Sequence, residues 1–143
     1  MSPIHILLVE DNEGDIILTR EALNMGGVNH EVSIVRDGEQ AIKFLNKEDI
    51  NYKAKRPDLI LLDINLPRID GFEVLSYIKK NEQLKTIPVI MLTTSTSEKD
   101  VLASYKNHAN CYISKPVDLD KFFEVVQKIE HFWNSIVHLP KND

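Results

Sequence analysis

The chain has 143 residues, of which 43% are hydrophobic and 27% charged, proportions that are ordinary for one globular domain. Its formal net charge of −5 argues against a broad nucleic-acid-binding surface, and its apolar runs are far shorter than the roughly 20 residues of a membrane span. The N-terminal residues enter a strand without the features of a secretory signal, and Cys111 is the only cysteine, so no internal disulfide forms. We therefore expect a single-domain cytoplasmic protein in which Cys111 is a reduced core residue.

Short apolar runs alternate with amphipathic segments, the pattern of βαβ units in a parallel sheet. In chain order, strands are expected near residues 4–9, 31–35, 58–62, 88–92 and 110–114. Helices are expected near residues 14–25, 38–47, 71–80 and 96–107, with a final helix from about 118 to 138. The polar segment from Asn46 to Pro57 has no period and is interpreted as a surface loop. The predicted fold is α/β, a flavodoxin-like, doubly wound (βα)5 parallel sheet with an extended C-terminal helix.

Polar side chains follow four of the five predicted strands. Glu10 and Asp11 follow the first strand, Asp63 the third, Thr93 the fourth and Lys115 the fifth. In an open parallel sheet, ligands bind in the crevice beyond the carboxyl ends of the strands. We therefore expect these side chains to converge on one pocket.

The second predicted strand is the exception, because Arg36-Asp37-Gly38 follows it instead of a chemically matched group. A strand order of 2-1-3-4-5 places the second strand at an edge of the sheet, away from the crevice. The exception therefore favours that order.

The adjacent acids Glu10 and Asp11 allow two interpretations. In the first, one carboxylate caps the following helix and the other is solvated. In the second, Asp63 from the neighbouring strand joins them, and three like charges are unfavourable unless a cation binds or a pKa rises. Oxygen ligands suit Mg²⁺, whereas no His or Cys stands at the spacing that zinc would need. We favour Mg²⁺ held by these three acids, with the carbonyl or side chain of Asn65 completing the shell.

A carboxylate can attack a phosphoryl group and form an aspartyl phosphate, and Asp63 is the best candidate because it ends a central strand. Phosphoryl transfer needs mainly positioning and charge neutralisation, which Lys115 and Mg²⁺ would supply. The Thr93 hydroxyl could donate a hydrogen bond to a phosphoryl oxygen. Taken singly, Thr93 and Lys115 are ordinary strand-end residues, but their joint placement indicates a metal-assisted phosphoryl-acceptor site.

The strand ends also carry a set of local motifs. They are Val9-Glu10-Asp11-Asn12, Leu62-Asp63-Ile64-Asn65-Leu66-Pro67 with Asp70-Gly71, Leu92-Thr93-Thr94, and Ser114-Lys115-Pro116. Together, and over essentially the whole chain, they resemble the motif set of response-regulator receiver domains, the CheY-like family. Glu10 departs from the commoner aspartate at the first acid position.

The resemblance implies a role for each matching residue. Asp63 would be the phosphoacceptor, Glu10 and Asp11 would hold Mg²⁺, and Lys115 would be the lysine of the site. Thr93 and Tyr112 would form a switch pair, and the peptide bond before Pro116 would be cis. Such a protein is not an enzyme in the usual sense, because it catalyses only its own phosphorylation and dephosphorylation.

A narrower resemblance links the chain to small regulators that are paired with bacterial phytochrome kinases. It rests on the long loop before the third strand, on Asn110-Cys111-Tyr112, and on Glu130-His131-Phe132-Trp133 through Leu139-Pro140. Those relatives commonly lack a proline after the lysine, whereas this chain keeps Pro116. The resemblance implies a stand-alone regulator with no output domain. It would be phosphorylated by a histidine kinase or a phosphotransfer protein and would signal through protein contacts, without binding nucleic acid or membrane.

The final predicted helix carries one apolar stripe with alternating spacings of 3 and 4. Its members are Leu119, Phe122, Val126, Ile129, Trp133 and Ile136. At 1.5 Å per residue this helix would be roughly 30 Å long, so its end should overhang strands of about 17 Å. Loops could cover the overhang, but Phe123, Phe132 and Val137 lie outside the stripe, and we favour a homodimer through the last helix and its neighbours.

The first predicted helix is ambiguous. Leu18, Ala22 and Met25 form the expected core stripe, while Ile16 and Leu23 share another face. Those two residues either pack under a neighbouring helix or help to dock a kinase.

Three other functions fit the sequence less well. An aspartyl-phosphate phosphatase usually needs a second acid two residues after its nucleophile, where this chain has Asn65. A flavin or nucleotide binder needs a glycine cradle in the first βα turn, where this chain has acids. The intact set of strand-end groups argues against a receiver-like domain that only binds partners.

Overall fold

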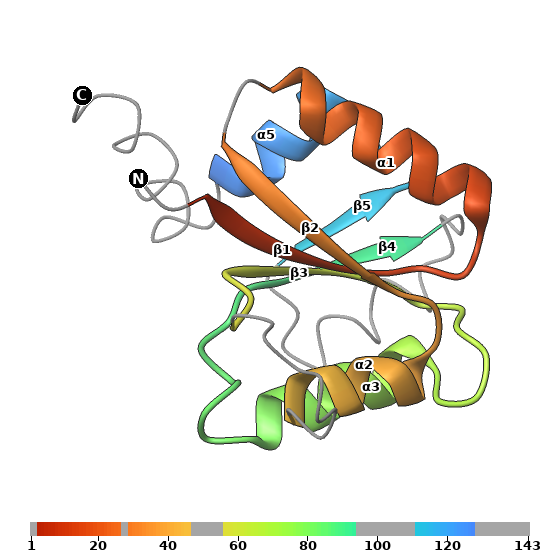
Figure 1. The fold of residues 1–143 in the computed structure, drawn as a ribbon, viewed down its shortest axis with the longest axis vertical. Coiled ribbons are helices and arrows are strands. Elements are labelled where there is room, and N and C mark those ends of the chain that lie inside the picture. The colour runs from red at the N-terminus through yellow and green to blue at the C-terminus, as the bar shows by residue number, and fades with distance from the viewer. Residues whose placement is uncertain (1–2, 27–28, 47–55, 94–110, 128–143) are drawn as a thin grey trace.

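The computed structural model describes residues 3–26, 29–46, 56–93 and 111–127, which form a five-stranded parallel sheet flanked by helices (Figure 1). The strands are β1 (Ile4–Val9), β2 (His30–Val35), β3 (Leu59–Asp63), β4 (Val89–Thr93) and β5 (Cys111–Ser114). They lie in the order β2-β1-β3-β4-β5, and every neighbouring pair is parallel. The predicted order is confirmed, with the second strand at an edge.

Four helices lie within the described residues: α1 (Glu13–Met25), α2 (Gly38–Asn46), α3 (Gly71–Lys80) and α5 (Leu119–Gln127). Helices α1 and α5 cover one face of the sheet, and α2 and α3 cover the other (Figure 1). The predicted helix at 96–107, most of the predicted loop at 46–57 and the continuation of the last helix from 128 to 138 lie outside the described residues.

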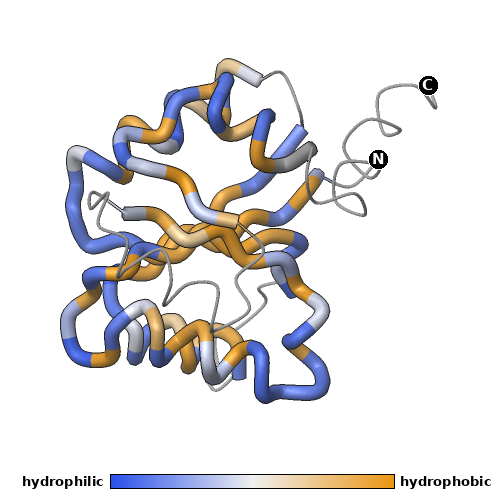
Figure 2. Tube along the Cα trace, turned by 180° about the vertical axis from the view of Figure 1, so that it is seen from behind, coloured by the Kyte–Doolittle hydropathy of each residue, from blue (hydrophilic) through white to orange (hydrophobic). Residues whose placement is uncertain are grey.

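The central strands are hydrophobic along their length, as their orange colour in Figure 2 shows. Their side chains are buried on both faces of the sheet, as expected where helices cover both faces. Side chains alternate along β1: Ile6 and Leu8 pack into the cluster under α1 and α5, whereas Leu7 and Val9 pack into the cluster under α2 and α3. Cys111 is half-buried against the first of these clusters.

Helix α1 presents a different face to the core from the one expected. Its buried residues are Ile16, Thr19, Ala22 and Leu23. Leu18 is 43% exposed and Met25 is 74% exposed, so the predicted core stripe is wrong at both positions. Ile16, Thr19 and Leu23 are spaced by 3 and 4 residues and so share one face of the helix, and this face packs into the cluster that includes Phe122 of α5. The packing alternative for Ile16 and Leu23 is confirmed.

Helix α5 packs against the C-terminal end of α1 through two phenylalanines. Phe122 is buried as expected, whereas Phe123, which was expected to be exposed, is half-buried. A Cβ atom on Gly26, which follows α1, would lie 3.0 Å from Phe123 Cζ. The absence of a side chain at Gly26 therefore leaves the space that the Phe123 ring uses.

Candidate functional site

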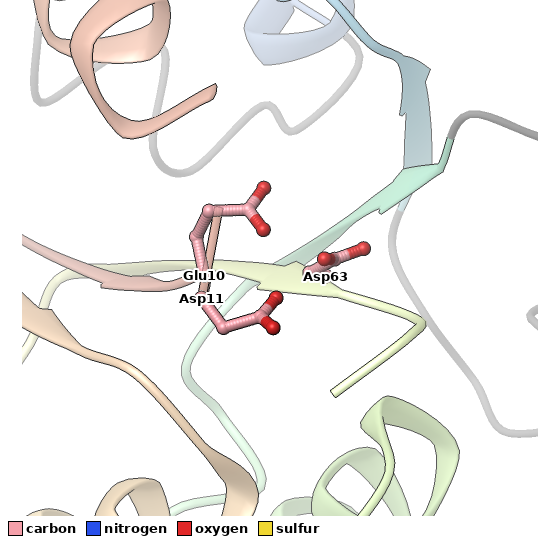
Figure 3. Close-up of side chains that lie close together, drawn as sticks. All are labelled: Glu10, Asp11 and Asp63. Carbon is pink, nitrogen blue, oxygen red and sulfur yellow. The ribbon is translucent and has the colours of Figure 1, made fainter. Parts of the chain in front are cut away.

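Three carboxylates meet at the carboxyl ends of the neighbouring strands β1 and β3. Glu10 and Asp11 follow β1, Asp63 is the last residue of β3, and the two strands are paired in register at Val9 and Leu62. One carboxylate oxygen from each acid lies within 4.8 Å of the others (Figure 3). Glu10 is fully buried and Asp63 is 3% exposed, whereas Asp11 is exposed and forms the solvent side of the group.

The residue that caps α1 is Asn12, whose Oδ1 accepts a hydrogen bond from the N–H of Asp15 at 2.9 Å. The interpretation in which Glu10 or Asp11 caps the helix is therefore wrong. With Asn12 as the cap, both acids before it remain available to the site.

Lys115 brings a positive charge to this group from β5. Its Nζ donates to Glu10 Oε1 at 2.8 Å, to Asp15 Oδ2 at 2.9 Å and to Asp63 Oδ2 at 3.2 Å. These three hydrogen bonds are as many as an ammonium group can donate. The backbone N–H of Lys115 donates to the Thr93 carbonyl at 2.8 Å, which holds the lysine against the end of β4. The peptide bond to Pro116 is cis, as the resemblance implied.

Burial and the neighbouring charges shift two pKa values in this group. Burial, together with Asp63, raises the pKa of Glu10 from 4.5 to about 7, although Lys115 acts in the opposite direction. Burial alone would lower the pKa of Lys115, but its ion pairs with Glu10, Asp15 and Asp63 outweigh burial and raise it above 10.5. Lys115 is therefore charged at all physiological pH values, whereas Glu10 can hold a proton near neutrality when no cation is bound.

Thr93 and Tyr112 lie on the same face of the sheet. Thr93 ends β4 and is buried, and Tyr112 on β5 is paired in register with Met91, which precedes Thr93 by two residues. Tyr112 is one of the exposed large side chains of the described residues. This arrangement is compatible with a switch pair.

The β3–α3 connection is built closely around Asp63. The N–H of Asn65 donates to Asp63 Oδ1 at 3.3 Å, and the Asn65 side chain is exposed at the mouth of the site. Gly71 opens α3, and a Cβ atom at this position would lie only 2.2 Å from the Asp63 carbonyl oxygen. The absence of a side chain at Gly71 thus allows α3 to approach the strand that ends in Asp63.

The structure brings together all the acids predicted for the site, with Lys115 in contact with two of them. Asp15 was not among the residues predicted for the site. An acid in the first turn of a helix is common because it interacts well with the helix dipole, so Asp15 carried no distinctive signal. One clue was available. Lys115 can donate three hydrogen bonds, and the predicted site did not provide a partner for each of them.

The donor atoms of the acid group suit a hard divalent cation. Glu10, Asp11 and Asp63 offer only oxygen, they come from two adjacent strands, and they lie close enough to share one ion. A cation would also relieve the repulsion between these carboxylates, in addition to the relief that the Lys115 ammonium gives through its contacts with Glu10 and Asp63.

The fold and this site define a receiver domain of two-component signalling. The family model of the response regulator receiver domain matches residues 6–127, and the chain belongs to this family. Its members are phosphoacceptor signalling proteins.

Within this family, the chain is similar to response regulators of phytochrome systems. The chain is 50% identical over 138 residues to the response regulator Rcp1 of Synechocystis sp., covering 96% of this chain and 94% of that protein. The crystal structure of the phosphorylated cyanobacterial phytochrome response regulator RcpA has a TM-score of 0.78 and 51% identity, covering 94% of this chain and 96% of that one. The crystal structure of the Mn²⁺-bound form of Rcp1 has a TM-score of 0.76 and 50% identity, covering 92% of this chain and 94% of that one. The resemblance to regulators of phytochrome systems is confirmed.

Within the part of the chain that the structure describes, none of the helices has the length and apolar character needed to cross a membrane.

Proposed function

We propose that this receiver domain accepts a phosphoryl group on Asp63 from the phosphohistidine of a histidine kinase or of a phosphotransfer protein. The observation that carries the proposal is the meeting of three acids within 4.8 Å beside the buried ammonium of Lys115. Asp63 is the acceptor in this proposal because it is the acid that ends a central strand and contacts Lys115, with an oxygen also bonded to Asn65 N–H.

In the transfer, an Asp63 carboxylate oxygen attacks the phosphorus atom. The phosphorus–nitrogen bond of the phosphohistidine breaks, and the imidazole leaves with the bonding electron pair and takes a proton from solvent. The Lys115 ammonium exchanges a carboxylate partner for a phosphoryl oxygen, and the Thr93 hydroxyl donates to another. Because phosphoryl transfer depends mainly on positioning and charge neutralisation, these groups suffice for the protein's part of the chemistry.

We propose Mg²⁺ as the cation of this site, held by Glu10, Asp11 and Asp63 together with Asn65. Bound there, Mg²⁺ would neutralise charge on the phosphoryl oxygens. The support is the all-oxygen donor set and the existence of a Mn²⁺-bound form of the similar Rcp1. Asn65 follows Asp63 by two residues at the exposed mouth of the site, where its carbonyl or side chain is accessible.

We propose a phytochrome-type histidine kinase as the phosphoryl donor, because RcpA, at 51% identity, is a phytochrome response regulator. The signal then passes on through protein contacts, in the cytoplasm, from this single domain. We also propose a homodimer through the last helix and its neighbouring elements. Its support is the sequence: the helix predicted to continue to residue 138 would overhang the sheet, and Phe132 and Val137 lie outside its apolar stripe. Co-purification with candidate kinases tests the proposed phosphoryl donor, and analytical ultracentrifugation tests the proposed homodimer.

The central test uses acetyl phosphate as a chemically simple donor. Wild-type protein with Mg²⁺ should gain the mass of one phosphoryl group, whereas Asp63→Asn and Asp63→Ala should gain none. Asp120→Asn is the matched control, because Asp120 is an exposed acid in the first turn of α5. A stable phosphoryl adduct on the Asp63→Asn protein, seen by intact-mass spectrometry, would show that the acceptor has been assigned wrongly.

A further inference from the structure

Lys115 has one carboxylate partner that the proposed metal set does not use. Its ammonium contacts Glu10, Asp63 and Asp15 at 2.8, 3.2 and 2.9 Å, and Glu10 and Asp63 are also members of the acid group that could hold a cation. Among these described partners, Asp15 alone lies outside that group. The side chain of Asp15 is 23% exposed, at the edge of the buried site.

The backbone of Asp15 is held in place independently of the lysine. Its N–H donates to Asn12 Oδ1 at 2.9 Å in the cap of α1, so the side chain leaves the first helical turn from a defined position. Lys115 is likewise held at its own backbone by the Thr93 carbonyl. The ion pair between Lys115 and Asp15 therefore joins the start of α1 to the end of β5, two elements that are 100 residues apart.

An ammonium and a divalent cation compete for the same acids. When a cation binds at Glu10 and Asp63, their lone pairs are partly taken, and the ammonium and the cation repel each other. If Glu10 and Asp63 were the only partners of the Lys115 ammonium, a cation bound to these two acids would weaken the ion pairs that hold the lysine at the site. Asp15 offers the ammonium a negative partner that the cation does not require.

We propose that Asp15 is a positioning residue that keeps the Lys115 ammonium beside the site while a divalent cation occupies Glu10, Asp11 and Asp63. The inference rests on the proposed function for the identity of the metal ligands. It predicts that Asp15 strengthens cation binding by acting through Lys115. An acid that acts only on the helix dipole would influence helix stability and would have no coupling to the lysine.

The experiment measures Mg²⁺ affinity by isothermal titration calorimetry, with no phosphoryl donor present. Asp15→Asn keeps the shape of the side chain and removes its charge. Glu13→Gln is the matched control, because Glu13 lies in the same turn of α1, is exposed, and pairs with Arg36 at 2.8 Å. Both substitutions are also made in a Lys115→Met background, which completes a double-mutant cycle.

Asp15→Asn is expected to weaken Mg²⁺ binding roughly tenfold in the wild-type background, which corresponds to about 1.4 kcal/mol. In the Lys115→Met background its effect should shrink to that of Glu13→Gln, about twofold or less, as for exposed charges. Asp15→Glu should restore part of the affinity, because it restores the charge. Far-ultraviolet circular dichroism of each variant shows whether it is folded.

Three outcomes would overturn the inference. Asp15→Asn and Glu13→Gln could weaken Mg²⁺ binding equally, or Asp15→Asn could have the same effect with and without Lys115. In either case the Asp15 charge acts through space and the lysine is not involved. If wild type and Asp11→Ala both fail to bind Mg²⁺, the proposed metal site is wrong, and the inference, which depends on that site, is wrong as well. Normal Mg²⁺ binding with an inert Asp15 would leave the proposed function standing.

Discussion

The buried acid Glu10 predicts an unusual dependence of stability on pH in the presence of a chelator. Its pKa is raised from 4.5 to about 7 by burial and by Asp63, so the folded protein holds a proton that the unfolded chain releases. Folding therefore takes up a proton between about pH 4.5 and pH 7. The stability that this proton contributes is present below pH 4.5 and is lost as the pH rises through 7.

The size of the effect follows from the shift. At about 1.36 kcal/mol per pKa unit, full loss of the proton lowers the free energy of unfolding by about 3 kcal/mol. About 2 kcal/mol of this loss should occur between pH 5 and pH 7, where the unfolded carboxyl is already ionised. Against a typical total of about 5–15 kcal/mol, such a change is easily measured.

The assay is urea unfolding followed by far-ultraviolet circular dichroism at several pH values in chelator, for wild type and Glu10→Gln. Glutamine keeps the length of the side chain but cannot titrate, so the variant should lose the downward trend that wild type shows between pH 5 and 7. Glu13→Gln is the control, because Glu13 is exposed and should leave the trend intact. Unfolding free energies of wild type and Glu10→Gln that run parallel with pH would refute the reasoning.

The same proton should couple to cation binding. A cation needs the ionised form of Glu10, so Mg²⁺ affinity should increase as the pH rises toward about 7 and should level off above it. In Glu10→Gln this dependence should disappear, together with part of the affinity.

Three further substitutions test other parts of the site. Asp11→Ala removes an exposed acid of the group, so it should weaken Mg²⁺ binding and slow phosphorylation while raising the melting temperature in chelator; unchanged Mg²⁺ affinity would contradict the site. Gly71→Ala places a Cβ atom 2.2 Å from the Asp63 carbonyl oxygen and should lower the free energy of unfolding by about 2–4 kcal/mol. The control is Gly14→Ala, which should be tolerated because the atom nearest to its Cβ is the side-chain Oδ1 of Asn12, at 3.3 Å. Thr93→Ala should still be phosphorylated by acetyl phosphate but should no longer change its association state with beryllofluoride and Mg²⁺; identical sedimentation responses of variant and wild type would show that Thr93 is not the coupling residue.

The sheet could be predicted from the sequence because each part of it is a local pattern. Continuous apolar runs mark strands that are covered on both faces, and the polar residues after them mark the carboxyl ends. The missing strand-end group after β2 then indicated the edge position, which the order β2-β1-β3-β4-β5 confirms. The acids Glu10, Asp11 and Asp63 followed from the same reasoning, since the ends of β1 and β3 must be adjacent in this order.

The faces of the helices were harder to predict, because hydropathy alone does not determine which side of a helix meets its neighbours. In α1, Ile16, Leu18 and Leu23 belong to two overlapping apolar stripes, and the choice between them depends on how α5 packs. Thr19 is buried in the core although it is polar, and no local pattern marks it. In α5, the position of Phe123 depends on the empty space at Gly26, which is distant in the sequence.

The ion pair between Asp15 and Lys115 was missed for a related reason, and it changes how the site should be understood. The order of the strands indicates which strand ends are adjacent. It does not determine the partners of Lys115, because a lysine side chain is long enough to extend across the end of β4 and to contact any of several acids. The acid group thus has the Lys115 ammonium beside it, and its charge can also be compensated by a proton on Glu10, whose pKa is raised to about 7, or by a cation held at Glu10, Asp11 and Asp63. Because all three act on the same carboxylates, a gain in one weakens the others, and binding of a cation must release the proton and loosen the lysine. Phosphorylation of Asp63 adds negative charge to this balance, so the lysine that Asp15 retains at the edge of the site is available to the new phosphoryl oxygens.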